Sequence, residues 1–170
     1  GVKTIKRFLN FNLAQKISNK YSKFDFIVAT NIIAQTNNLD KILQSIKLLL
    51  SKKGLLIIEV QYLYDLLAQK GFDSFHPEHI RYYTLSSIIK VLENYKLYVF
   101  DAERLSVHGG ILRVYASLNK KVRSKNLKKV LKKENDKKIF SKLKNLNSFR
   151  KKFNLRIKNF LKNLKKQKKK

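Results

Sequence analysis

The chain has 170 residues, no cysteine, and 39 Lys and Arg against 11 Asp and Glu, which gives a formal charge of +28. The lack of cysteine excludes disulfides, thiolate metal sites and a cysteine nucleophile. The length suits one compact domain with an appendage. No apolar run approaches the roughly 20 residues that cross a bilayer, so we expect no membrane partner. We expect the cytoplasm as compartment.

The first half of the chain alternates helix and strand patterns. Apolar residues recur at three- and four-residue spacing in 4–18 and 39–50, which predicts amphipathic helices. FDFIVAT (24–30) and GLLIIEV (54–60) are continuous apolar runs, typical of strands that are buried on both faces. We expect Gly54 to cap the helix over 39–50. Strand, helix and strand together predict a βαβ unit with parallel strands.

Further elements extend this unit to residue 118. A short helix is predicted over 62–71, and Thr84 is a candidate cap for a helix that follows it. KLYVFDAERL (96–105) and GGILRVYASL (109–118) are two strand patterns joined by a short turn, which predicts an antiparallel pair. The predicted fold class is therefore α/β, an open Rossmann-like sheet with parallel strands and an antiparallel edge pair. Such sheets bind ligands at the carboxyl ends of their strands.

Residues 119–170 hold most of the positive charge, with 23 Lys and Arg against 2 acidic residues. Apolar residues from Phe140 to Leu164 recur at helical spacing between the lysines, which predicts a basic amphipathic helix. This charge supports one alternative function, a nucleic-acid or polyanion binding protein. Phe residues at helical spacing are more often core than stacking platforms, so we expect no specific nucleic-acid partner.

All three histidines lie between positions 76 and 108. FDSFHPEHIRYYTL (72–85) places His76, Glu78 and His79 around Pro77, in a predicted loop that follows a strand. An imidazole beside a carboxylate is suited to general base catalysis, and a loop with two surface histidines is the alternative. The spacing of His76 and His79 is too short for the helical pair of metal ligands, so no metal is expected.

The turn at His108 has two interpretations. Its two glycines, in the run His-Gly-Gly, would let backbone N–H groups approach an anion. A plain glycine turn between the two strands is the other interpretation.

The run FDSFHPEHIRYYTLSSIIKVLENYKLYVFDAERLSVHGGILRVYA resembles the S-adenosylmethionine-dependent sugar C-methyltransferases, which methylate a carbon of a nucleotide-linked keto-deoxysugar. Members show Tyr-x-Glu-His, then a helix, a strand ending Val-Phe-Asp-Val-Glu, and His-Gly-Gly-Ser-Leu-Arg-Val-Tyr. The upstream VATNIIAQTNNLDKILQSIKLLLSKKGLLIIEV resembles the family's Ala-Asn-Asn-Val-x-Ala-His segment, amphipathic helix and strand. The resemblance covers residues 1 to 118.

The resemblance implies a role for each matching residue. His79 would be the general base, Glu78 its orienting or sugar-binding partner, and Asn31 a cofactor contact. His76 stands where the family has tyrosine, and Gln35 where it has histidine. Both can still hydrogen-bond a sugar oxygen. The remaining candidates, which would contact substrate oxygens or phosphate, are His108, Gly109, Gly110 and Arg113.

The resemblance also implies that the chain is the middle of a larger enzyme. Family members carry a cysteine-rich zinc-binding domain and a Gly-rich cofactor loop upstream, and a second α/β domain downstream. We therefore expect residues 1–118 to be the carboxyl half of a methyltransferase domain, and residues 119–170 to begin the next domain. The implied cofactor is S-adenosylmethionine, with its main binding loop outside this chain. A folded but inactive remnant is a further alternative.

Overall fold

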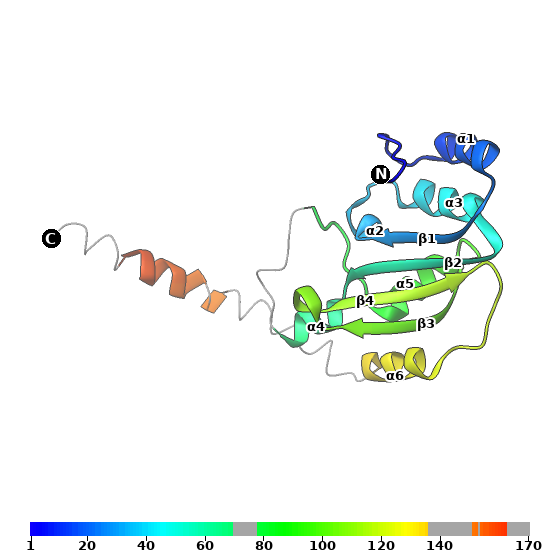
Figure 1. Ribbon diagram of the computed structural model, residues 1–170. Coiled ribbons are helices and arrows are strands. Elements are labelled where there is room, and N and C mark those ends of the chain that lie inside the picture. The colour runs from blue at the N-terminus through cyan, green and yellow to red at the C-terminus, as the bar shows by residue number, and fades with distance from the viewer. Residues whose placement is uncertain (70–77, 136–150, 153, 163–170) are drawn as a thin grey trace.

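The computed structural model describes residues 1–69, 78–135, 151–152 and 154–162. Its centre is a four-stranded mixed sheet in the order β1-β2-β4-β3 (Figure 1). Strands β1 (Phe24–Thr30) and β2 (Leu50–Gln61) are parallel, while β4 (Ile111–Ser117) runs antiparallel to both β2 and β3 (Tyr98–Leu105). The predicted α/β class, parallel βαβ unit and antiparallel pair are confirmed. Because β4 lies between β2 and β3, the carboxyl ends of β1, β2 and β3 share one edge.

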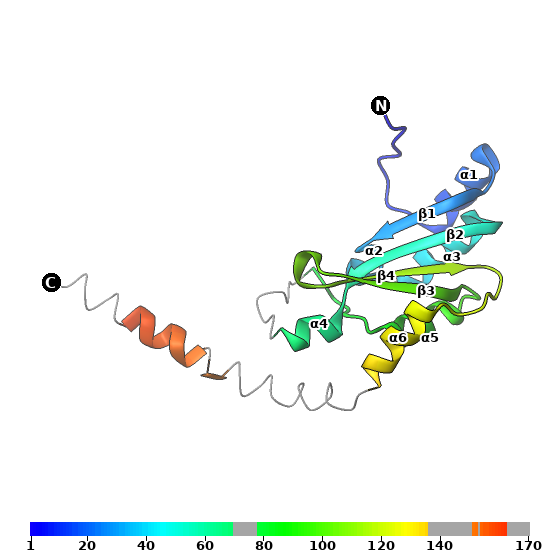
Figure 2. The ribbon, with the colours of Figure 1, turned by 60° about the horizontal axis from the view of Figure 1, so that its bottom comes forward.

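Six α-helices accompany the sheet within residues 1–69 and 78–135. They are α1 (Phe11–Tyr21), α2 (Ile32–Gln35), α3 (Leu39–Leu49), α4 (Leu63–Ala68), α5 (Leu85–Glu93) and α6 (Lys125–Glu134). Figure 2 shows α5 and α6 lying together beside β3, at one side of the sheet. The core forms where alternate strand residues meet helix residues, and it includes Leu56, Ile58, Leu112, Val114, Leu43, Ile46, Ile88, Leu92, Leu127 and Val130.

The prediction that β1 is buried on both faces is wrong, because the described residues leave the face with Phe24, Phe26 and Val28 uncovered. Phe26 is 70% exposed and Val28 is 63% exposed, although both alternate along the strand with core positions such as Ala29. Their neighbour on the same face, Phe24, is also exposed. The edge strand β1 thus presents an apolar surface.

Two further local predictions need correction. Helix α1 begins at Phe11 rather than at residue 4, because the side chain of Asn10 accepts a hydrogen bond from the Leu13 N–H at 2.9 Å and caps the helix there. Gly54 does not cap α3 but lies within β2. A Cβ on Gly54 would lie 3.0 Å from the Phe24 carbonyl oxygen, so glycine permits the close approach of β1 and β2.

The cap of α5 is confirmed. Thr84 Oγ1 accepts a hydrogen bond from the Ser87 N–H at 3.2 Å, and Ser87 Oγ accepts one from the Thr84 N–H at 3.0 Å. This capping box fixes the residue at which α5 begins.

The basic segment is described only in part. Its first helix, α6, packs on β3 and α5 through buried Leu127 and Val130. Residues 154–162 are helical, with Leu155 and Phe160 exposed. The predicted stripe at Phe140 lies outside the described residues. Among the helices that the structure describes, none is long and apolar enough to cross a membrane. The domain boundary at residue 118 stays a prediction.

Candidate functional site

Two buried amide oxygens lie at the carboxyl ends of neighbouring parallel strands. Asn31 directly follows β1 in the left-handed backbone region (φ 59°), and its N–H donates to the Glu59 carbonyl oxygen at 2.8 Å. Gln61 is the last residue of β2 and is 8% exposed. Within the described part of the chain, neither Asn31 Oδ1 nor Gln61 Oε1 has a hydrogen-bond partner. A buried acceptor without a partner costs about 1–3 kcal/mol, so this edge is suited to a ligand that donates hydrogen bonds.

Gln61 was missed at the sequence level. A polar residue directly after the apolar run GLLIIEV marks the end of the strand, which is where α/β sheets place their binding groups. The position of Gln61 at the end of this apolar run is therefore the sequence signal that could have identified it.

The segment that carries Glu78 and His79 is tied to the segment that follows β1. The Arg81 N–H donates to the Ala34 carbonyl oxygen at 3.2 Å, and its guanidinium Nη1 donates to the carbonyl oxygen of Thr36. Tyr83 Oη donates to the Ile33 carbonyl oxygen at 3.1 Å. Burial raises the pKa of Tyr83, which keeps its hydroxyl protonated as this donor. These hydrogen bonds hold the 78–83 segment against the residues that follow β1.

The individual loop candidates differ in burial. His79 is half-buried, with Nδ1 shielded from solvent, and its ring lies edge-on to Tyr82 at a centroid distance of 6.0 Å. Glu78 and Gln35, the last residue of α2, are exposed. His76 lies outside the described residues. The catalytic and binding roles of these residues stay predictions.

The glycine turn between β3 and β4 is fixed against the start of α4. Gly109 and Gly110 have φ values of 77° and 114°, and exposed His108 also has a positive φ of 49°. The Gly110 carbonyl oxygen accepts a hydrogen bond from the Tyr62 N–H at 3.0 Å. A Cβ on Gly110 would lie 2.5 Å from the Asp65 Cβ, so the turn needs glycine here both for its conformation and for this close approach.

Arg113 takes part in an ion-pair row across the sheet. Its Nε donates to Glu59 Oε1 at 2.6 Å, and its Nη1 lies 3.6 Å from Glu103 Oε2. The hydrogen bond with Glu59 raises the pKa of the Arg113 guanidinium. Since Glu59, Arg113 and Glu103 are direct neighbours in the strand register, this row stabilises the strand pairing. The substrate contact assigned to Arg113 stays a prediction.

A second ion pair lies at the start of α4. Asp65, which is 4% exposed, accepts hydrogen bonds from Nε and Nη2 of Arg104 at the end of β3. The guanidinium carbon lies 5.7 Å from the Tyr62 ring centroid and 5.6 Å from that of Tyr64. No local sequence pattern predicts this cluster, because its members come from two distant segments. No group of three or more His, Asp or Glu residues suited to a metal occurs in the described ranges.

Comparison with known proteins gives one curated relative. The chain is 29% identical over 117 residues to C-methyltransferase NovU of Streptomyces niveus, and the match covers 69% of this chain and 28% of that protein. The chain therefore spans less than a third of the length of this relative.

Solved structures with a similar fold share little sequence. A SAM-dependent methyltransferase of Thermotoga maritima has a TM-score of 0.46 at 13% identity, covering 56% of each chain. The magnesium protoporphyrin IX methyltransferase of Synechocystis, with bound SAH, has a TM-score of 0.43 at 15% identity, covering 60% of this chain and 46% of that one.

The family model described as a methyltransferase domain matches residues 4–101, which is more than half of the chain. This range contains β1, β2 and the segment with Glu78 and His79, so it includes most of the candidate site. The chain belongs to the methyltransferase-domain family, and S-adenosylmethionine, the cofactor predicted from the sequence, is the methyl donor of such domains.

Proposed function

We propose that this chain is part of an S-adenosylmethionine-dependent C-methyltransferase that methylates a carbon next to a ketone in a nucleotide-linked deoxysugar. The similarity to C-methyltransferase NovU supports carbon as the methylated atom, and the sequence motifs around His79 and His108 support the sugar. One structural observation carries most weight. The 78–83 segment, which includes His79, is hydrogen-bonded to α2 directly after β1, and this supports a site at the carboxyl ends of β1 and β2.

The residues at this edge fit part of the cofactor. Asn31 Oδ1 and Gln61 Oε1 are buried acceptors, and S-adenosylmethionine offers an ammonium group and ribose hydroxyls as donors. When bound, it supplies a methyl group on a positively charged sulfur.

His79 is the proposed general base. Its imidazole would remove the proton from the carbon next to the ketone, and the electron pair of that C–H bond would form an enolate. The enolate carbon would then form the new C–C bond with the methyl group as the methyl–sulfur bond breaks and leaves its electron pair on the sulfur, while the proton would remain on the imidazole. Glu78 would orient the imidazole or bind the sugar, and Gln35, His76 and His108 would contact substrate oxygens.

The test uses a full-length protein that contains this segment. In deuterated water, NMR follows both exchange of the proton next to the ketone and methyl transfer. We expect His79→Asn to abolish both while leaving substrate binding largely intact, because a missing base affects the transition state more than the ground state. Gln35→Ala serves as the comparison and should act more mildly, through substrate affinity. Exchange and methylation at the parent rate in His79→Asn would assign the base to another residue.

A further inference from the structure

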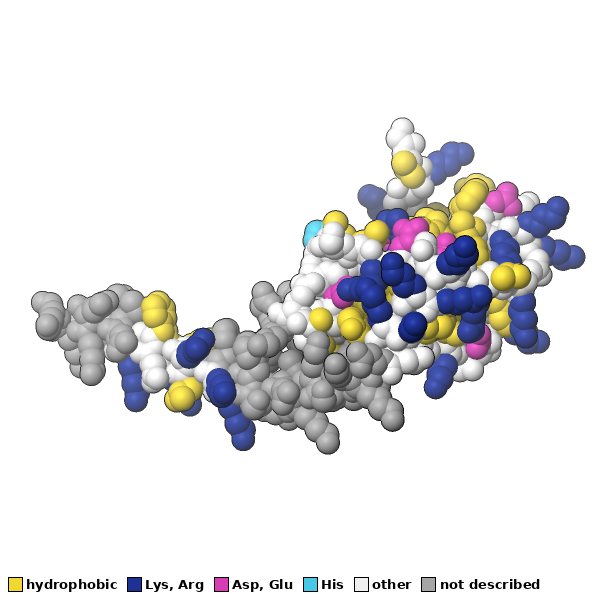
Figure 3. All heavy atoms as spheres, turned by 90° about the horizontal axis from the view of Figure 1, so that it is seen from below, with side chains coloured by type: hydrophobic (Ala, Val, Ile, Leu, Met, Phe, Trp, Pro, Cys, Tyr) yellow, Lys and Arg dark blue, Asp and Glu magenta, His cyan; other side chains and the backbone are white. Residues whose placement is uncertain are grey.

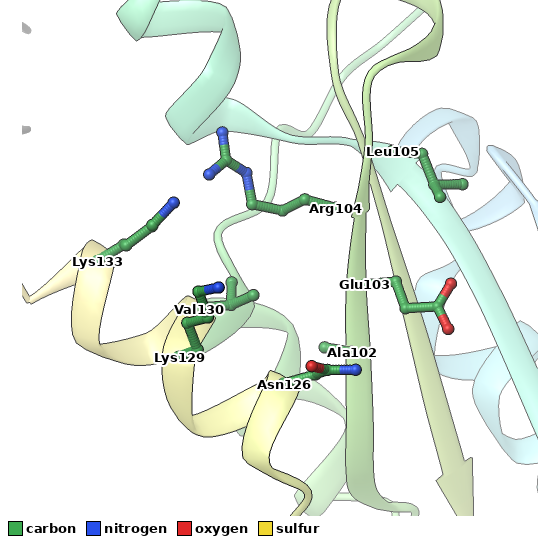
Figure 4. Close-up of a pocket in the computed structure, with 8 residues that line it drawn as sticks. All are labelled: Ala102, Glu103, Arg104, Leu105, Asn126, Lys129, Val130 and Lys133. Carbon is green, nitrogen blue, oxygen red and sulfur yellow. The ribbon is translucent and has the colours of Figure 1, made fainter.

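A cavity of about 400 Å³ lies between β3 and α6. Arg104 and Leu105 line it from β3, and Asn126, Lys129, Val130 and Lys133 line it from α6 (Figure 4). The four α6 positions are spaced three and four residues apart, so they share one face of the helix. Buried Val130 therefore anchors this face to the sheet, while its polar neighbours border the cavity.

The positive groups converge on this cavity. Figure 4 shows the Lys133 ammonium directed toward the Arg104 guanidinium, with Lys129 one turn back along α6. In the part of the chain that the structure describes, neither lysine has an ion-pair partner. Glu103 also borders the cavity, but its carboxylate is directed to the other side of β3, where it pairs with Arg113.

Arg104 is held in place before any ligand binds. Its Nε and Nη2 are hydrogen-bonded to Asp65, and its guanidinium lies near the rings of Tyr62 and Tyr64. Asp65 occupies two of the three guanidinium nitrogens, which leaves Nη1 for another acceptor. A guanidinium fixed in this way loses less conformational entropy on binding an anion than a mobile one would.

The local charge is positive. Arg104, Lys129 and Lys133 carry three positive charges, and Asp65 carries one compensating negative charge. Figure 3 views the molecule from the α6 side and shows many Lys and Arg side chains there, with few acidic ones. Like charges that face one cavity repel one another, and an anion between them would relieve that repulsion.

We propose that this cavity binds the diphosphate group of the nucleotide-linked substrate, an inference that rests on the proposed function. The cavity lies at the carboxyl end of β3, at the same edge of the sheet as the ends of β1 and β2. Asp65 contacts both Arg104 and the Gly110 turn, so the cavity is physically connected to the candidate site. A volume of about 400 Å³ is within the range of small-molecule sites, which a diphosphate with part of its attached groups can fill.

The experiment measures diphosphate binding to the 170-residue chain. Inorganic diphosphate is titrated at about 0.15 M salt, with affinity from calorimetry and location from backbone amide shifts. We expect saturable binding with shifts concentrated in residues 102–105 and 126–133. The Lys129→Ala/Lys133→Ala variant should bind roughly 10-fold more weakly or worse, because it loses two charge-assisted hydrogen bonds.

The matched control is Lys128→Ala/Lys132→Ala, which removes the same charge from the solvent side of the same helix. We expect it to retain the parent affinity. Equal losses in both variants, or shifts confined to residues after 135, would overturn the proposal in favour of diffuse binding to the basic segment. Stronger binding of single-stranded RNA at this cavity than of diphosphate would replace the small-molecule ligand with a nucleic acid.

The result is independent of catalysis. Diphosphate binding that depends on Lys129 and Lys133 would stand even if His79→Asn proved fully active. Conversely, active methyl transfer combined with no diphosphate binding would overturn only the assignment of this cavity.

Discussion

Glu134, near the end of α6, is expected to be one of the most sensitive positions for stability. Its carboxylate is buried and accepts three hydrogen bonds from other segments. The donors are Tyr62 Oη at 2.8 Å, the Ser86 N–H at 2.9 Å, and the Leu85 N–H. Leu85 and Ser86 are the first residues of α5, so Glu134 caps that helix from a different helix.

The magnitude follows from the groups that Glu134→Ala leaves without a partner. The buried Tyr62 hydroxyl loses its acceptor, which costs about 1–3 kcal/mol. The two N–H groups at the start of α5 lose a negatively charged cap, which costs about 1–2 kcal/mol, while the Thr84 cap remains. We therefore expect the free energy of unfolding to fall by about 2–5 kcal/mol, a large share of a typical domain stability.

Two further variants separate these contributions. Glu134→Gln keeps the shape and one acceptor, but its amide NH₂ would face an N–H donor of α5, so we expect an intermediate loss of about 2 kcal/mol. Tyr62→Phe removes only one donor and should cost about 1 kcal/mol. In the double variant Tyr62→Phe/Glu134→Ala the losses should sum to less than the two single effects, because the hydroxyl is no longer left without an acceptor.

Urea unfolding, followed by circular dichroism, measures these differences, provided that the m-value is unchanged. Lys132→Ala, an exposed position on the same helix, is the control and should change the free energy of unfolding by less than about 0.5 kcal/mol. If Glu134→Ala behaved like Lys132→Ala, α6 would not dock through this carboxylate, and the reasoning would be refuted.

Three other predictions concern different parts of the molecule. Gly110→Ala should lower the free energy of unfolding by about 2 kcal/mol or more in the same assay, because it adds strain at positive φ and a clash with Asp65; a neutral effect would contradict the described turn. Burial, followed by the nearby Glu134 carboxylate, raises the pKa of the Tyr62 hydroxyl above the value of an unfolded tyrosine. The stability that the protonated hydroxyl contributes is therefore complete below about pH 10 and is lost as the pH rises further. In Tyr62→Phe the free energy of unfolding should therefore fall less steeply between about pH 9 and about pH 11. A slope equal to that of the parent would contradict the raised pKa of Tyr62. Residues 119–170 should bind DNA and RNA weakly, without sequence preference and with steep salt dependence, and sequence discrimination at physiological salt would favour the nucleic-acid alternative.

Much of the fold could be predicted because its signals are local. The apolar runs of β1 and β2, the helical spacing of α3 and the Thr84 cap each depend on residues that are close in sequence. The error at Gly54 has the same origin. A glycine after a helix resembles a cap, whereas the reason for this glycine is the carbonyl oxygen of Phe24, 30 positions earlier in the chain.

The candidate site could be predicted only in those loops that carry a recognisable sequence motif. Residue types and motifs mark the 78–83 segment and the His108 turn as candidates, but they do not indicate which residues pack against them. The ion pair of Asp65 and Arg104 joins residues 39 positions apart, and the hydrogen bond of Tyr62 and Glu134 joins residues 72 positions apart. No local pattern marks such pairs, because their formation depends on how the helices pack on the sheet.

Helix α6 shows why the basic composition of this segment does not by itself identify a partner. Its ten residues include five lysines, yet the helix has three distinct sides. Leu127, Val130 and Glu134 face the core and α5, Lys129 and Lys133 border the cavity with Arg104, and Lys128 and Lys132 face solvent. The same helix therefore stabilises the fold and supplies the proposed anion contacts. If charge alone determined binding, all these lysines would be equivalent. If the cavity determines it, only the two that face Arg104 will matter, which is the difference that the paired lysine variants measure.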